Sequence, residues 1–369
     1  MTRNIRTAYT GDQPVEVMDT ISNGEAVSYR FEIQVSAQPQ SGGGMNSPPT
    51  TAALTLSLTG PFERQGTEAA EGVRLWAELA GIRLTLVDDR GSKTAAARAY
   101  AAWLDSMDLL IGPYASGLVR AVAPLVRDAG RLLWNHGGSA DDLAQPGVVS
   151  LPAPASSYFD GVVDEAVARR VDRLVVVQGT GPFAQAVADG TTTRASERGL
   201  DVRAIEVSAV DAEDAAGAAF VLASRFEDDV AVVRGLRRAG RTPALLGAVA
   251  AGIPAFAREL GEAAEGVLGP VQWWPNDHTP EIGPSGTNFA TCYRRRTSRE
   301  PSYPAAQAAA AGYLAHAAHQ QGLQGEDMPQ WATSTLLGDF ALDADWRQVG
   351  HHVTTVRWQG GQMVPLATD

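Results

Sequence analysis

The chain has 369 residues, a formal net charge of -12 and a hydrophobic fraction of 44%. Single hydrophobic cores stop growing near about 250–300 residues, so this length favours two domains. The Lys and Arg residues are scattered apart from a run at 294–296, which excludes the basic face of a nucleic-acid-binding protein. No segment approaches the ~18 apolar residues of a membrane span, so none is expected.

The first 50 residues are predicted to form an N-terminal extension and linker. Strand-like pieces at 15–18 and 26–35 precede residues 40–50, which are rich in Gly, Ser and Pro. That composition is typical of a flexible linker.

From residue 51 the sequence alternates between predicted strands and helices. Helices are expected at 67–79, 93–104 and 116–128, between strands at 51–58, 82–87, 108–112, 131–135 and 148–151. Strands separated by helices indicate right-handed crossovers and a parallel sheet. The Pro-rich step at 151–154 then predicts a crossover between lobes.

A second alternating series repeats this architecture. It comprises strands at 173–178, 201–207, 218–224 and 243–247 with helices at 158–169, 182–197 and 227–239. Residues 269–275 predict a second crossover, and Ala-rich helices at 288–296 and 304–320 are expected to return to the first lobe. Strands at 338–343 and 352–359 are placed in the second lobe, so lobe I is predicted as 51–151 plus 276–335 and lobe II as 152–275 plus 336–369.

Metal and redox chemistry find little support in the sequence. The single cysteine, Cys292, has no partner for a disulfide or a CxxC site. His316 and His319 share a helix face, but no third ligand is spaced to complete a site. We therefore expect no metal and no cofactor.

One motif points toward nucleotide chemistry. Residues Gly179–Ala184 have the pattern GxGxxA after a strand and at the start of a helix, which is typical of dinucleotide binding. A dinucleotide site of this type also needs an acid at the end of the next strand, where it binds the ribose hydroxyls. In this sequence Glu206 falls inside the predicted strand. Pro182 also removes a backbone donor for phosphate, so a nucleotide-dependent enzyme stays an alternative.

Polar residues follow the predicted strands of the first lobe, where ligands bind in open α/β sheets. The glycines at 137 and 138 are expected to let backbone amides face a ligand carboxylate or carbonyl. Asp88 and Asp89 end a strand and are expected to be solvated helix caps. The candidate first-lobe ligand residues are Gln65, Tyr114, Ser116, Gly137, Gly138 and Ser139.

Several ordered segments are familiar together: SLTGPFERQGTEAAEGVRL, LLIGPYASGLVRAVAPL, RLLWNHGGSADDL, GEAAEGVLGPVQWWP, REPSYPAAQAAAAGYLAH and GDFALDADWRQVGHH. From about residue 51 onward the chain resembles the type I periplasmic binding proteins of branched-chain amino-acid and amide ABC transporters. The resemblance implies an α/β fold of two Rossmann-like lobes with parallel sheets, joined by a three-strand hinge. It also implies that the ligand is held in the interlobe cleft and is not chemically changed, so no enzyme is expected.

The resemblance also implies roles for individual residues. Ser116 and the pair at 138–139 match groups that hold a ligand carboxylate, and Gln65 matches an inward-facing cleft position. Phe183 and Phe226 match aromatic walls of the second lobe.

Relatives that bind α-amino acids hold the ammonium with an acid after the strand matching PALLG. This chain has Ala250 in that segment instead, so an amino acid would need Glu227 or Asp228. An amide, a urea-like solute or a carboxylate fits more easily, because a buried ammonium without a partner is costly.

The sequence thus predicts a protein that captures a small polar ligand, an amino acid, amide or urea-like solute, for an ABC permease. A cytoplasmic amide or amino-acid sensor with a regulatory protein as partner is the alternative within binding proteins. The sequence as written starts without a signal peptide or lipobox, which predicts a cytoplasmic location. The family implies an extracytoplasmic one if the true start lies upstream.

Overall fold

The computed structural model describes residues 2–10, 13–22, 27–32 and 48–366, and it divides into two compact units. Unit 1 contains the chain up to Gly138 with Asp142–Pro152 and Pro275–His351. Unit 2 contains Ser139–Asp141, Ala153–Trp274 and the chain from His352. The chain therefore passes between the units after residues 152, 274 and 351, apart from the short excursion at 139–141.

The N-terminal extension contains a three-stranded antiparallel sheet. Its strands are β1 (Thr2–Thr10), β2 (Gln13–Ser22) and β3 (Val27–Glu32), in the order β1-β2-β3. Strand β2 includes the predicted piece at 15–18 and β3 lies within the predicted piece at 26–35, whereas β1 was not predicted. Most of the expected linker, up to residue 47, lies outside the described residues.

Unit 1 is built on a five-stranded sheet in the order β5-β4-β6-β7-β8, and every neighbouring pair in it is parallel. The strand order reverses between β4 and β6, and such a switch point is where α/β sheets bind ligands. The strands are β4 (Thr51–Leu56), β5 (Arg83–Asp88), β6 (Leu109–Ile111), β7 (Leu133–Asn135) and β8 (Val148–Ser150). The helices between them are α1 (Glu63–Ala80), α2 (Lys93–Trp103) and α3 (Ser116–Asp128).

Two later helices, α8 (Gly286–Thr297) and α9 (Tyr303–Gln321), pack against α1, as expected for unit 1. Small residues allow the close approach of α1 and α9. A Cβ built on Gly72 would lie 2.0 Å from the carbonyl oxygen of Ala305, and one on Gly312 would lie 2.2 Å from the Trp76 ring. This contact therefore leaves no room for a side chain at either glycine.

Unit 1 also includes a short hairpin whose second strand the sequence prediction placed in lobe II. Strand β14 (Thr333–Thr335) pairs with β15 (Gly338–Phe340), and the Phe340 ring packs against Trp331. Gln348 donates to the carbonyl oxygens of Ser150 and Leu151, both at 3.4 Å. These contacts group residues 336–351 with unit 1, whereas the prediction started the last part of lobe II at residue 336.

Unit 2 has a seven-stranded sheet in the order β10-β9-β11-β12-β13-β16-β17. The first five strands are parallel and the last two are antiparallel additions. They are β9 (Arg173–Gln178), β10 (Asp201–Glu206), β11 (Ala219–Ala223), β12 (Leu245–Ala248), β13 (Leu268–Val271), β16 (Thr354–Gln359) and β17 (Gln362–Pro365).

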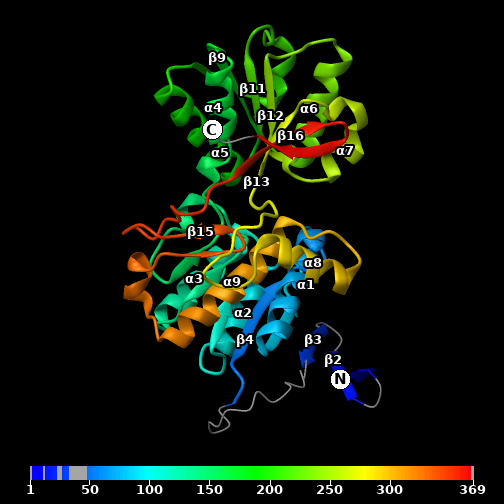
Figure 1. The fold of residues 1–369 in the computed structure, drawn as a ribbon, viewed down its shortest axis with the longest axis vertical. Helices are drawn as coiled ribbons and strands as arrows, with labels where there is room; N and C mark the ends of the chain where they lie inside the picture. The colour runs from blue at the N-terminus through cyan, green and yellow to red at the C-terminus, as the bar shows by residue number, and fades with distance from the viewer. Residues whose placement is uncertain (1, 11–12, 23–26, 33–47, 367–369) are drawn as a thin grey trace. The chain divides into compact units, whose positions relative to one another are not determined.

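Helices cover both faces of the unit 2 sheet (Figure 1), with α4 (Asp160–Ala168) and α5 (Pro182–Glu197) on one face. Helices α6 (Phe226–Arg238) and α7 (Ala255–Leu260) cover the other. Alternate residues of each central strand enter the two cores, so both faces are apolar. The predicted fold class, an α/β protein with two parallel-sheet lobes, is confirmed. Among the described residues, no helix has the length and apolar character needed to cross a membrane.

Candidate functional site

Two adjacent acids shape the carboxyl edge of the unit 1 sheet. Asp88 accepts hydrogen bonds from the Leu58 amide at 2.9 Å and the Thr59 hydroxyl at 2.7 Å. Asp89 is fully buried and accepts the Ser57 hydroxyl at 2.6 Å, and burial raises the pKa of this carboxyl. The expectation of solvated helix caps was wrong, because both acids hold the loop after β4.

The glycine turn after β7 is organised by a buried asparagine. The Asn135 side-chain oxygen accepts the amide of Gly138 at 2.8 Å and that of Gly137 at 3.3 Å. The Asn135 side-chain nitrogen donates to the Gly138 carbonyl at 2.7 Å and to the Ser150 hydroxyl at 2.9 Å. In this structure both glycine amides are thus used by Asn135, contrary to the expectation that they face a ligand.

Aromatic side chains surround this turn within unit 1. The Tyr114 hydroxyl lies 2.6 Å from the Tyr303 hydroxyl, and the Tyr114 ring packs against Phe62 and His136. A Cβ on Gly137 would lie 2.3 Å from the Tyr114 carbonyl oxygen, so these two predicted residues meet. His136 is fully buried, and neither of its ring nitrogens has a hydrogen-bond partner among the described residues. Burial lowers the pKa of His136 to about 4, which keeps its ring neutral.

The other two predicted residues of unit 1 lie in first turns of helices at the same edge. Gln65 is the third residue of α1 and is half-buried. Ser116 is the first residue of α3 and is also half-buried. Both helices follow strands that flank the switch point, β4 and β6.

In unit 2, Tyr158 connects two of the predicted residues. Its hydroxyl donates to the Ser139 hydroxyl at 3.1 Å, and its ring packs edge-on against Phe183 at 5.3 Å. The Ser139 carbonyl also accepts the Ala155 amide at 2.7 Å, so Ser139 groups with unit 2 rather than with the predicted lobe I. Sequence reasoning missed Tyr158, although it directly follows the predicted crossover.

The remaining predicted residues of unit 2 lie around a buried carboxylate. Phe226 begins α6 and packs on the α6–α7 side of the sheet. Asp229 is fully buried in the first turn of the same helix and accepts hydrogen bonds from the Ser224 hydroxyl and, at 2.9 Å, from the Ala250 amide. Burial raises the pKa of Asp229 to about 7. Sequence reasoning considered Glu227 and Asp228 as acids here and missed Asp229.

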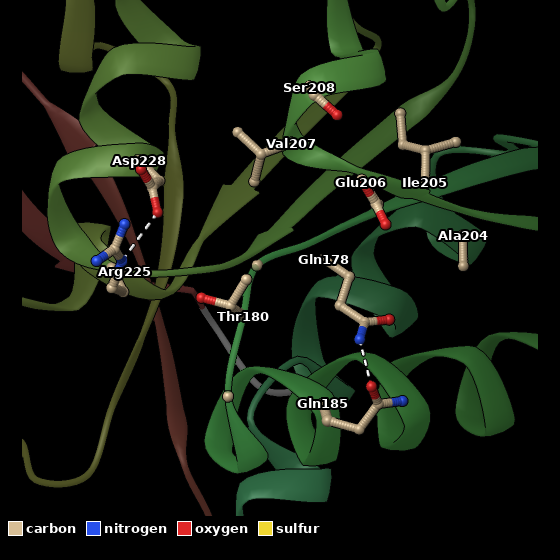
Figure 2. A pocket seen from close by; sticks show the side chains of 12 residues that line it. Gln178, Thr180, Gln185, Ala204, Ile205, Glu206, Val207, Ser208, Arg225 and Asp228 are labelled. Atoms are coloured by element: carbon tan, nitrogen blue, oxygen red, sulfur yellow. Dashed lines mark hydrogen bonds and ion pairs between the residues drawn. The ribbon is translucent and has the colours of Figure 1, made fainter.

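A pocket of about 660 Å³ opens where β9, β10 and β11 end (Figure 2). The motif turn at 179–181 forms one wall. Gly181 has a φ of 101°, which favours glycine, and a Cβ on Gly179 would lie 2.6 Å from the Ser224 Cβ. Strand β10 ends at Glu206, so the acid lies at the strand end after all, in register with Gln178. The pocket lining includes none of the nine predicted ligand residues.

No group of three or more His, Cys, Asp and Glu side chains within the described ranges is arranged to hold a metal ion. The polar groups described above are instead hydroxyls, amides and carboxylates at the carboxyl edges of two sheets. Such groups bind and orient a small polar molecule by hydrogen bonds.

Two doubly wound α/β units with polar side chains at the carboxyl edges of their sheets define a ligand-binding protein of the two-lobed class. The chain belongs to the periplasmic binding protein family, whose sequence profile matches residues 49–362. The predicted family is therefore confirmed, and its members are substrate-binding proteins rather than enzymes.

Solved structures agree on the fold. A leucine-binding protein from Thermotoga maritima aligns with a TM-score of 0.71 and 20% identity, covering 86% of this chain and 98% of its own. A branched-chain amino acid transporter substrate-binding protein from Streptococcus pneumoniae, in complex with isoleucine, aligns with a TM-score of 0.69, 16% identity and coverage of 86% and 100%.

A third structure differs from these two in its ligand. It is an ABC transporter solute-binding protein from R. palustris in complex with benzoate, with a TM-score of 0.65, 16% identity and coverage of 86% and 96%. The comparison with curated proteins gave no match.

Proposed function

We propose that this protein captures a small solute carrying a carboxylate or carboxamide and delivers it to an ABC permease. The family supports the binding role, because the solved structures with the same fold are substrate-binding proteins of ABC transporters. The family's name also supports an extracytoplasmic location for the protein. The expectation that one ligand contacts both units stays a prediction.

The absence of an exposed acid after β12 carries the proposed ligand class. Residues 248–250 are Ala-Val-Ala, and the amide of Ala250 donates to Asp229. Asp229 is fully buried, and its raised pKa disfavours the charged form that an ammonium needs. A ligand without an ammonium avoids this deficit, and the R. palustris protein with the same fold is in complex with such a ligand, benzoate.

The hydroxyls of Ser116 and Ser139 are proposed as donors to the ligand's oxygen atoms, with Gln65 and Tyr114 nearby in unit 1. Gly137, Gly138 and Ala250 are proposed to shape the site through their small size. Phe183 and Phe226 are proposed as its apolar walls.

The test is a thermal-shift screen of short carboxylates, aromatic carboxylates, amides, urea and amino acids. A ligand at 100 times its Kd stabilises the folded protein by about 2.7 kcal/mol, which for a chain of this length corresponds to a shift of about 3–4 °C. We expect a carboxylate or amide to give this shift in the wild type but not in Ser116→Ala or Ser139→Ala. Ser196→Ala is the matched control, since Ser196 is exposed on α5.

A shift with α-amino acids alone would contradict the proposed ligand class. A shift that survives both serine substitutions would contradict the proposed residues. Fractionation and affinity purification test location and partner, because a cytoplasmic protein that co-purifies with a regulator would favour the sensor alternative.

A further inference from the structure

The pocket between the ends of β9, β10 and β11 lies at the sheet edge where doubly wound folds bind ribose. Its charged residues, however, disfavour a phosphate group. We propose that this pocket binds an uncharged sugar through its vicinal hydroxyl groups, either a free monosaccharide or the ribose of a nucleoside. The site uses none of the residues proposed above for the transported solute.

A carboxylate and an amide stand side by side at the edge of this pocket. Glu206 ends β10 and Gln178 ends β9, and the two are register partners on neighbouring parallel strands. Their backbones are therefore about 4.8 Å apart, with side chains on the same face. Figure 2 shows both side chains at the pocket. Both side chains are long enough to converge on adjacent hydroxyls of a sugar, so the pair fits a vicinal diol.

Glu206 is available for this role. Its side chain is exposed and makes no hydrogen bond or ion pair with another residue in the described part of the chain. An ionised carboxylate only accepts hydrogen bonds, and its two oxygens can accept from two hydroxyls at once. In doubly wound folds, an acid at the end of this second strand binds the ribose hydroxyls.

The orientation of Gln178 is set by a chain of side chains. Asp189 only accepts, so the Gln185 nitrogen donates to it, at 2.7 Å. The Gln185 oxygen then accepts from the Gln178 nitrogen. This leaves the Gln178 side-chain oxygen as an acceptor for a second sugar hydroxyl.

The charges of the pocket disfavour a phosphorylated ligand. Arg225 is the cationic residue of the lining, and its Nε lies 3.1 Å from an Asp228 oxygen. With Arg225 paired, the Glu206 carboxylate leaves the lining with a net negative charge. Pro182 has no N–H at the first position of α5, so the helix start offers one fewer amide to a phosphate. The glycine turn thus lacks the electrostatics that pyrophosphate needs.

The rest of the lining suits the carbon skeleton of a sugar. Ile205 and Val207 flank Glu206 and are half-buried, and Ala204 adds a further apolar surface. Thr180 and Ser208 contribute hydroxyls. The volume of about 660 Å³ accommodates a monosaccharide or a nucleoside.

Isothermal titration calorimetry with D-ribose, adenosine, 2′-deoxyadenosine and AMP tests the proposal on the full chain. We expect ribose, adenosine or both to bind, and which of them binds identifies the source of the sugar. Removal of the 2′-hydroxyl should weaken nucleoside binding by about tenfold, because Glu206 would lose a charge-assisted hydrogen bond. AMP should bind more weakly than adenosine.

Glu206→Gln should weaken sugar binding by about tenfold. Asp201→Asn is the matched control, since Asp201 begins the same strand at its opposite end and is exposed. Absence of binding by both ribose and adenosine would overturn the proposal, as would AMP binding at least as tightly as adenosine. Equal binding by wild type and Glu206→Gln would also overturn it. Ser116→Ala should leave sugar binding unchanged, which separates this site from the solute site.

Discussion

The buried carboxylate of Asp229 accepts a hydrogen bond from the backbone amide of Ala250 at 2.9 Å. This bond joins the first turn of α6 to the 3-10 turn at Val249–Gly252, which directly follows β12. Related proteins are expected to carry a ligand-binding acid in the segment after β12. Here the backbone of that segment is bound by Asp229 of α6 instead.

Asp229→Asn should stabilise the protein increasingly as the pH rises from about 4 to 7. Burial raises the folded-state pKa of Asp229 to about 7 from its ordinary value of 3.8, so the folded state binds more protons than the unfolded state in this window. Stability of the wild type then falls with pH by up to about 1.4 kcal/mol per pH unit from this group. Asparagine removes that dependence because it does not titrate. It can still accept a hydrogen bond from the Ala250 amide and donate one to the Ser224 hydroxyl.

Urea unfolding of both proteins at pH 5, 6, 7 and 8 measures this effect. The stability difference should grow up to about pH 7 and then level off. Asp201→Asn, an exposed strand position, should show no such trend. A difference independent of pH would contradict the raised pKa.

His136 should lower the stability of the folded protein as the pH falls, whereas Asp229 lowers it as the pH rises. Burial lowers its folded-state pKa to about 4 from 6.5, so the unfolded state binds more protons between these values and stability falls as the pH decreases. His136→Phe should weaken the loss of stability between pH 6.5 and 4, because phenylalanine has no proton to bind. Unfolding midpoints at pH 4.5 and 7 compare the two proteins, with His352→Gln as the exposed control. An unchanged acid sensitivity in His136→Phe would exclude this role.

Two helical glycines should respond oppositely to alanine. Gly72→Ala should destabilise unit 1 by about 2–4 kcal/mol, since its Cβ would lie 2.0 Å from the Ala305 carbonyl oxygen and force α1 and α9 apart. Gly235 lies in α6 and a Cβ there meets nothing within 4 Å, so Gly235→Ala should stabilise by about 0.5–1 kcal/mol. Thermal unfolding distinguishes the two, and equal effects would contradict the packing described for α1 and α9.

The sequence predicted the two α/β series because most of the strands are short apolar runs that alternate with helices, although β10 is largely polar. β9 and β11 were placed within a residue of their bounds, since strands buried on both faces are continuous in hydrophobicity. The split after residue 335 differed from the structure because a short hairpin such as β14–β15 has no pattern that says which sheet it joins.

The candidate sites were less predictable from the sequence. Ser139 was assigned to lobe I because it follows a strand of that lobe, yet its hydrogen bonds to Tyr158 and Ala155 lie in unit 2. Glu206 was placed inside its strand because the apolar alternation continues through Val207, whereas the pairing of β10 with β9 ends at Glu206. Backbone pairing, which no single residue encodes, fixed the end of that strand.

The sequence by itself determined the family, the alternation of elements and the absence of a charged residue at 248–250. Those properties depend on residue order and periodicity. Only the tertiary structure decided which of three consecutive acids is buried, because Glu227, Asp228 and Asp229 are each rotated by about 100° around α6. That rotation leaves Glu227 exposed, directs Asp228 to the pocket and buries Asp229 against Ala250.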